Sequence, residues 1–138
     1  MIQAVNIKDS LGEYKEIRID GHAGYAESGQ DIICAAVSVL AQNAVNSIET
    51  FTDDPFQAEV NEEDGALAVR FQNSVSEKTK LLLDSMVLGL ESIEESYGNL
   101  FEYEKTISTL KVGLVKNSQI FILITISFYS QKNSIFSK

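Results

Sequence analysis

The sequence predicts an α+β domain in which two helices pack on a mainly antiparallel sheet. Two patterns indicate this class: short runs in which apolar and polar side chains alternate, and two longer runs in which apolar residues recur every three or four positions. Along residues 1–104 these runs predict the element order β-β-α-β-β-α-β. A chain of 138 residues is large enough to bury one core without disulfides or metals.

The alternating runs predict two hairpins and one final strand. Residues 9–12 separate the first two strands and residues 61–65 the next two, and both segments are rich in turn-forming residues. The fifth strand is expected after the second helix. The predicted strands are 2–7, 14–19, 56–60, 66–71 and 100–104.

Both predicted helices have one apolar face. The first is expected at about 32–51 with Asp31 as its N-cap, and it ends before Pro55, which disfavours a helical residue before it. The second is expected to begin at a cap formed by Asn73 or Ser74. The apolar positions are Ile33, Val37, Leu40, Ala44, Ile48 and Phe51 in the first, and Leu82, Leu83, Met86, Val87, Leu90, Ile93 and Tyr97 in the second.

The charge balance of the chain is acidic, with a net charge of −9. All 20 acidic side chains lie within residues 1–104 together with six basic ones, whereas residues 105–138 contain five lysines and no acid. Direct binding to nucleic acid or to an anionic membrane surface needs clustered Lys and Arg. We therefore expect no direct nucleic-acid partner, no membrane partner and a basic protein as the binding partner.

The carboxyl-terminal residues differ in character from the rest of the chain. We predict one α+β domain over residues 1–106 and an atypical basic and apolar tail over residues 107–138. Residues 119–128 form a nearly continuous apolar run, which is shorter than the about 20 residues that a transmembrane helix needs. The leading explanation of this tail is a frameshifted or otherwise atypical end of the chain, and the alternative is a true additional strand.

One stretch, residues 20–38, contains the only histidine and the only cysteine of the chain, His22 and Cys34. Glycines lie close to the histidine and between it and the cysteine. Because glycine adopts backbone angles that other residues avoid, this spacing predicts a shaped loop that orders over substrate. The glycines of this predicted substrate loop are Gly21, Gly24 and Gly29.

The pair of His22 and Cys34 suggests a general base and a nucleophile. Cys34 is predicted in the first turn of its helix, where unpaired N–H groups and the positive end of the helix dipole favour a thiolate. The same N–H groups, including that of Cys34, are candidate oxyanion donors. His22 is predicted at or just after a strand end, from which its imidazole can take the thiol proton. The alternative is structural: Cys34 as a small core residue and His22 as a partner of the backbone.

Three further residues are candidates for supporting roles. Asp31 is suited to orient His22, but its predicted capping role explains it equally well and is the one we favour, and Asp20 is a second candidate for that orientation. Ser38 lies one turn after Cys34 on the same face and fits either packing or a supporting hydrogen bond.

The same stretch excludes some chemistry. A structural zinc site usually has four protein ligands, and the chain has one His and one Cys, so we expect no metal and no cofactor. A lone cysteine forms no intrachain disulfide and fits a reducing cytoplasm. The first residues lack the pattern of a secretory signal, which also favours a cytoplasmic location.

The residues from Gly21 to Ser38 also carry a family resemblance. The motif Gly21-His22-Ala-Gly-Tyr25, followed by Gly29 and by Asp31-Ile-Ile-Cys-Ala-Ala-Val-Ser38, resembles the signature of the ribosomal-processing cysteine proteases of Gram-positive and related bacteria. The resemblance extends loosely over about the first hundred residues and does not cover the tail.

The resemblance implies a specific activity. Cys34 matches the family's nucleophile, His22 its general base, and Ser38 a family serine. The family removes a short N-terminal extension from a protein of the large ribosomal subunit, as ribosome assembly requires, and tends to form homodimers. The expected function is therefore a cytoplasmic cysteine endopeptidase acting on a ribosomal protein precursor. The alternatives are a non-catalytic ribosome-assembly or binding protein and a redox-active thiol protein.

Overall fold

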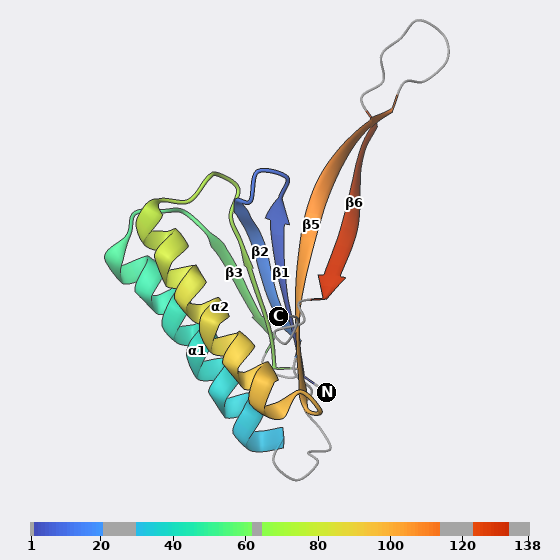
Figure 1. Ribbon diagram of the computed structural model, residues 1–138. Coiled ribbons are helices and arrows are strands. Elements are labelled where there is room, and N and C mark those ends of the chain that lie inside the picture. Colours follow the sequence, from blue (N-terminus) through green and yellow to red (C-terminus); the bar gives the residue numbers. More distant parts are fainter. Residues whose placement is uncertain (1, 21–29, 62–64, 114–122, 133–138) are drawn as a thin grey trace, which may run out of the picture.

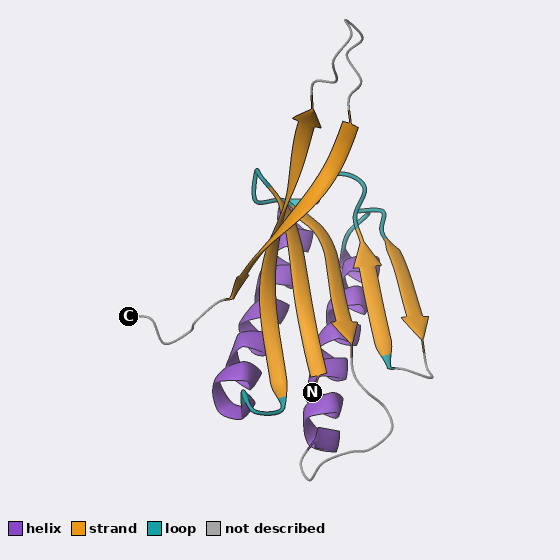
Figure 2. Cartoon of the chain, turned by 90° about the vertical axis from the view of Figure 1, so that its right-hand side faces the viewer, coloured by secondary structure: helices purple, strands orange, loops and turns teal. Residues whose placement is uncertain are grey.

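The computed structural model describes residues 2–20, 30–61, 65–113 and 123–132, and within them the side chains of 2–20, 32–61 and 65–107. Both helices cover one face of the sheet (Figures 1 and 2). The elements are β1 (Ile2–Asp9), β2 (Tyr14–Asp20), α1 (Gln30–Phe51), β3 (Gln57–Asn61), β4 (Ala66–Arg70), α2 (Glu77–Tyr97), β5 (Phe101–Gly113) and β6 (Leu123–Lys132). The predicted α+β class and the order of the first seven elements are confirmed.

The sheet is mixed but mainly antiparallel. In the described residues it has six strands in the order β3-β4-β2-β1-β5-β6. Every neighbouring pair is antiparallel except β1 with β5, which are parallel. The α2 crossover explains this parallel pair. Because α2 returns the chain to the same end of the sheet, β5 runs in the same direction as β4. β1 also runs in that direction, since both β1 and β4 are antiparallel to β2.

The first hairpin turns where its composition predicts a turn. Gly12 has φ +80, a backbone conformation that glycine adopts without strain. The N–H of Gly12 donates to the carbonyl of Asp9 at 3.0 Å, and the carboxylate of Asp9 accepts from the N–H groups of Leu11 and Glu13. This turn sets the β1–β2 register, in which Gln3 pairs with Asp20.

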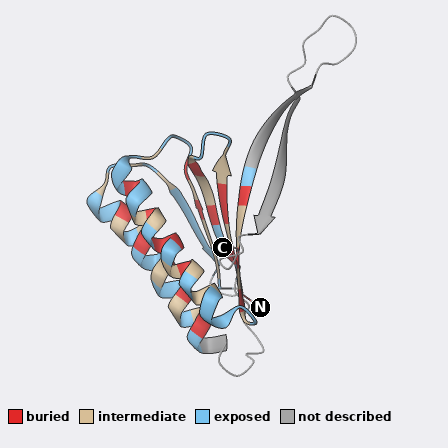
Figure 3. Cartoon of the chain, in the orientation of Figure 1, coloured by how far each residue is buried: buried red, intermediate tan, exposed pale blue. Residues whose placement is uncertain are grey.

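The core lies between the helices and the sheet (Figure 3). The buried side chains of α1 are Ile33, Val37, Ala41, Ala44 and Ile48, and those of α2 are Thr79, Leu83, Met86, Val87 and Leu90. Phe51 and Tyr97, predicted on the apolar faces, are exposed, since each is the last residue of its helix. Residues Ile32–Phe51 are long and apolar enough to cross a membrane by composition alone, but here one face of the helix packs on the sheet.

Both predicted helix starts are corrected by the structure. α2 begins after Ser76, whose Oγ accepts from the N–H of Thr79, rather than after Asn73 or Ser74. The carboxylate of Asp54 decides this start, because it accepts from both the N–H and the Oγ of Ser76. α1 begins at Gln30, so Asp31 is its second residue and not its N-cap.

The tail contains a strand. β5 runs to Gly113, well beyond the predicted 100–104, and pairs with β6 from Glu104 to Gly113. Since β1 pairs with β5 only as far as Ser108, β5 and β6 continue as a two-stranded ribbon beyond the rest of the sheet (Figure 1). The tail therefore contains β6 as an additional strand, and the leading explanation, an atypical end of the chain, stays a prediction. The division into residues 1–106 and 107–138 stays a prediction, and β5 runs through it.

Candidate active site

Cys34 is the fifth residue of α1, at the beginning of its second turn rather than in its first. Its side chain is half-buried and packs against the core cluster. A helix that begins at Gln30 includes the N–H of Cys34 in its regular bonding pattern, because each N–H donates to the carbonyl four residues earlier. The N–H groups available for an oxyanion therefore belong to residues that precede Cys34.

The direction of Cys34 follows from its neighbours on the helix. Val37 points straight into the core, and at roughly 100° per residue Cys34 and Leu40 lie on opposite sides of it. Leu40 faces α2: a Cβ built on Gly89 of α2 would be 2.8 Å from a methyl carbon of Leu40. Cys34 therefore lies on the flank of α1 that faces away from α2.

The end of β2 and the start of α1 lie at the same end of the molecule (Figure 2). β2 ends at Asp20, so His22 follows the strand end by two residues, in agreement with the predicted strand boundary. His22 itself and the predicted loop glycines Gly21, Gly24 and Gly29 lie outside the described residues. Nine residues, 21–29, connect the strand to the helix that carries Cys34.

The supporting candidates are distributed over the same end. Ser38 is exposed and one turn after Cys34, on the same flank of α1. Asp20, at the end of β2, is also exposed. The backbone of Asp31 is in the first turn of α1, but its side chain lies outside the described set. The orienting role of Asp31 and the supporting role of Ser38 stay predictions.

The described part of the chain contains no set of side chains that could bind a metal ion. No group of three or more His, Cys, Asp or Glu side chains converges there in a way that could hold an ion.

The sequence predicted no role for β3, which lies at the sheet edge on the α1 side (Figure 1). Its alternating pattern predicted a strand but contained no signal of its position in the sheet.

Cys34 is a lone, half-buried cysteine near the start of a helix that packs on the sheet of an α+β domain. These features indicate a small thiol hydrolase as the class of protein to test. Residues 1–102 match the family model described as cysteine protease Prp. The chain belongs to this family of cysteine proteases, which are hydrolases.

Relatives and solved structures agree with this membership. The chain is 31% identical over 101 residues, 70% of this chain and 90% of the relative, to the ribosomal processing cysteine protease Prp of Bacillus subtilis. It is 30% identical over 86 residues, 62% of this chain and 81% of the relative, to the protein of the same description from Staphylococcus aureus.

The fold matches solved crystal structures. The essential ribosomal processing protease Prp of S. aureus, in complex with a substrate peptide, superposes with a TM-score of 0.73 at 26% identity, over 76% of this chain and 99% of that one. A structure from Streptococcus mutans superposes with a TM-score of 0.69 at 32% identity, over 78% of this chain and 95% of that one.

Proposed function

We propose that this protease is a cytoplasmic endopeptidase that removes the N-terminal extension of a large-subunit ribosomal protein precursor with a dyad of Cys34 and His22. The observation that carries the proposal is Cys34, the only cysteine of a chain in a cysteine protease family. It lies on the flank of α1 that faces away from α2, at the end of the molecule where β2 ends. Relatives described as ribosomal processing proteases support the substrate class.

The proposed chemistry is acyl transfer in two steps. His22 accepts the thiol proton, and the Cys34 sulfur attacks the scissile carbonyl carbon to form a tetrahedral intermediate. The C–N bond then breaks, His22 returns the proton to the leaving amine, and a thioester remains on Cys34. Water, deprotonated by His22, attacks the thioester, and the C–S bond breaks to release the acid and restore the thiol.

The charge of the chain fits a basic substrate. Ribosomal proteins are basic because they neutralise RNA phosphates, and this chain has a net charge of −9. Opposite net charges speed the encounter of enzyme and precursor at low ionic strength. A homodimer, as the family resemblance implies, is part of the same proposal and is tested by sedimentation velocity.

The test is mass spectrometry of the extended precursor after incubation with enzyme. We expect wild-type protein to release the N-terminal extension, and Cys34→Ala and Cys34→Ser to leave the precursor uncut. Val45→Ala is the matched control, because Val45 is also partly buried on the same flank of α1, three turns further on. It should retain cleavage.

Two outcomes would contradict the proposal. Wild-type protein that binds the precursor without cutting it would support a non-catalytic ribosome-assembly protein. Reversible oxidation of Cys34 by peroxide, without any peptidase activity, would support a redox-active thiol protein.

A further inference from the structure

β3 forms one edge of the sheet, so among the described strands it pairs with β4 on one side only. All five of its residues are exposed (Figure 3). The N–H and C=O groups along such an edge pair readily with one kind of ligand, an extended polypeptide backbone. This edge is therefore a candidate recognition surface for a protein that acts on polypeptides.

The side chains of β3 offer an apolar strip on the helix side of the sheet. Ala58 and Val60 pair with Val69 and Leu67 of β4, whose side chains belong to or pack against the core. Val60 is nevertheless 67% exposed, because the helix layer stops short of this strand. In a polypeptide paired with β3, every second side chain would lie on the same face of the sheet as Val60, and the nearest of these would cover it.

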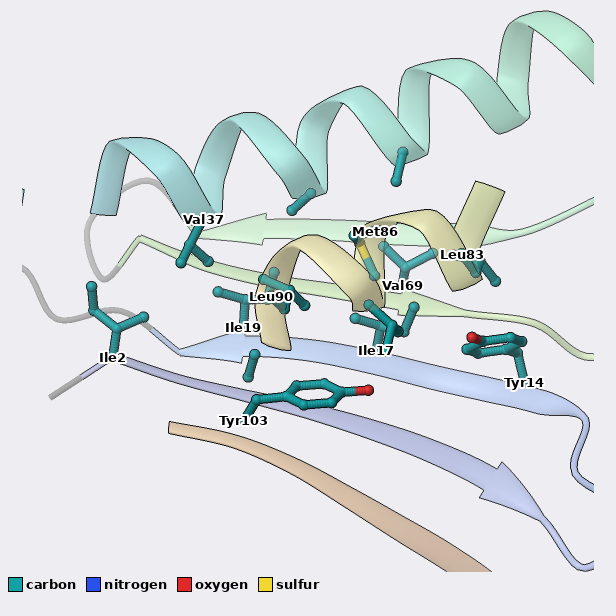
Figure 4. Close-up of a cluster of buried hydrophobic side chains, with 14 of the residues drawn as sticks. Ile2, Tyr14, Ile17, Ile19, Val37, Val69, Leu83, Met86, Leu90 and Tyr103 are labelled. Carbon is teal, nitrogen blue, oxygen red and sulfur yellow. The ribbon is translucent and has the colours of Figure 1, made fainter. Parts of the chain in front are cut away.

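The sheet register connects this strip to Cys34. Val60 pairs with Leu67, and Leu67 pairs with Ile19, so the three side chains form one row across β3, β4 and β2. Ile19 lies near Val37 in the core (Figure 4), and Val37 is one turn from Cys34. Since neighbouring strands lie about 4.8 Å apart, Val60 is roughly 10 Å across the sheet from Ile19, on the side that Cys34 faces.

We propose that the outer edge of β3 binds the substrate polypeptide as an added strand, a few residues from its scissile bond. This inference rests on the proposed endopeptidase function and adds its recognition element. At about 3.3 Å per residue, three to five residues of extended chain span the distance from this edge to the flank that carries Cys34. The bound segment has a small or apolar side chain at alternate positions, facing Val60.

A second copy of this chain is a poorer occupant of the same edge. A two-fold antiparallel pair centred on the five-residue β3 would bring Glu59 opposite Glu59, and like charges in that position are destabilising. Both copies also have a net charge of −9. The carboxylate of Glu59, which already pairs with Arg70 at 3.1 Å, suits a basic substrate better than an acidic copy.

The first test compares Val60→Glu with Leu81→Glu, using a peptide that spans the cleavage site of the precursor. Leu81 is the matched control because it is 70% exposed and on α2, away from β3. We expect Val60→Glu to raise KM about tenfold with kcat retained, because one valine loses its apolar contact with the peptide. Leu81→Glu should leave both constants unchanged.

The second test leaves the enzyme intact and removes single N–H donors from the peptide by N-methylation. Along an added strand, alternate N–H groups point towards β3, so KM should rise about tenfold at every second position of the bound segment and little between them. An unchanged KM for Val60→Glu, or N-methyl effects without this period of two, would overturn the β3 proposal. The proposal would also be overturned if sedimentation showed a dimer for wild-type protein and a monomer for Val60→Glu while KM stayed unchanged. Absence of cleavage by wild-type protein would instead contradict the endopeptidase function itself.

Discussion

The two ends of the helix layer are held in different ways. At the start of α1, which carries Cys34, the helix is held by apolar packing: Ile33 and Val37 belong to one core cluster with Ile2 and Ile19 of the sheet. Val37 and Ile19 lie close together in Figure 4. At the opposite end, α2 starts in a set of directional hydrogen bonds. There Asp54 accepts from Ser76 and Thr79, and Asp84 accepts from Tyr14 at 2.5 Å and from Lys80 at 2.7 Å.

This difference separates the residues of the proposed chemistry from those that position the scaffold. Polar groups at the far end are hydrogen-bonded to one another, so substitutions there should affect stability without touching the cleavage reaction. At the near end, Cys34 is half-buried on the flank of an apolar core, at the opposite end of the helix layer from the Asp54 and Asp84 hydrogen bonds. Four substitutions test this separation.

The largest effect is expected for Cys34→Ala. Loss of the nucleophile should reduce precursor cleavage by at least about 10³-fold. Because Cys34 is only half-buried and alanine is also small, the free energy of unfolding should change by less than about 1 kcal/mol. Cleavage rates and urea unfolding of the same preparations measure both quantities. A large fall in the urea midpoint would show that Cys34 is part of the core.

Ile33→Ala, at the residue just before Cys34, should mainly reduce stability, whereas Cys34→Ala should mainly reduce cleavage. Ile33 is 2% exposed, so truncation leaves a cavity that costs about 2–5 kcal/mol of unfolding free energy. Urea unfolding at pH 7 measures this cost. The control is Ile32→Ala, since Ile32 is exposed and its truncation should change stability by less than about 0.5 kcal/mol. Equal costs for the two variants would contradict the assigned orientation of α1.

Local sequence patterns predicted most elements, because alternation and three- or four-residue spacing report which side of an element is buried. They failed where a distant residue decides. The start of α2 depends on Asp54, 22 residues before Ser76, so the nearer Asn73 and Ser74 were equally plausible caps. Asn6 is buried within a strand because its amide donates to the hydroxyl of Tyr103 at 3.1 Å, a contact 97 residues apart in the chain.

The candidate site was predictable for a different reason. His22 and Cys34 are single occurrences, so composition drew attention to them, and the predicted strand end and helix start place them at one end of the predicted fold. The dyad itself stays a prediction. The role proposed for the β3 edge was not predictable, because it depends on strand order. Hairpin patterns specify that β3 pairs with β4, but not that β4 then pairs with β2 and leaves β3 at the edge.

At the far end, Asp54→Ala should cost about 1–2 kcal/mol at pH 7, because it removes the acceptor of three hydrogen bonds at the start of α2. Hydrogen bonds from Ser76 and Thr79 lower the pKa of Asp54 below its usual 3.8. A pKa lowered by folding stabilises the protein above pH 3.8, and this contribution is lost as the pH falls through the folded-state value. Urea unfolding from pH 7 to pH 2 should therefore show the difference between wild type and Asp54→Ala shrinking below about pH 4. The control is the exposed neighbour Asp53, whose alanine variant should change the free energy of unfolding at pH 7 by less than about 0.5 kcal/mol.

The smallest effect is expected for Tyr14→Phe, which removes the hydroxyl that donates to Asp84 and should cost about 1 kcal/mol at pH 7. Burial is the main cause that raises the pKa of Tyr14, and its hydrogen bond to Asp84 raises it further. Burial alone would raise the pKa of Asp84 as well, but hydrogen bonds from Lys80 and Tyr14 lower it. A tyrosine whose pKa is raised by folding contributes stability below about pH 10, and this contribution is lost as the pH rises further.

Thermal unfolding between pH 8 and pH 11 measures this contribution. Wild-type protein should lose stability above about pH 10, and Tyr14→Phe should lose less over the same range, so that the two curves converge. Tyr97→Phe is the control, because Tyr97 is exposed at the end of α2 and loss of its hydroxyl should change the free energy of unfolding at pH 8 by less than about 0.5 kcal/mol. Precursor cleavage by Tyr14→Phe at pH 7 should equal that of wild type, since Tyr14 begins β2 and the proposed site lies beyond the other end of that strand. A variant with normal stability and impaired cleavage would show that the two ends of the molecule are coupled.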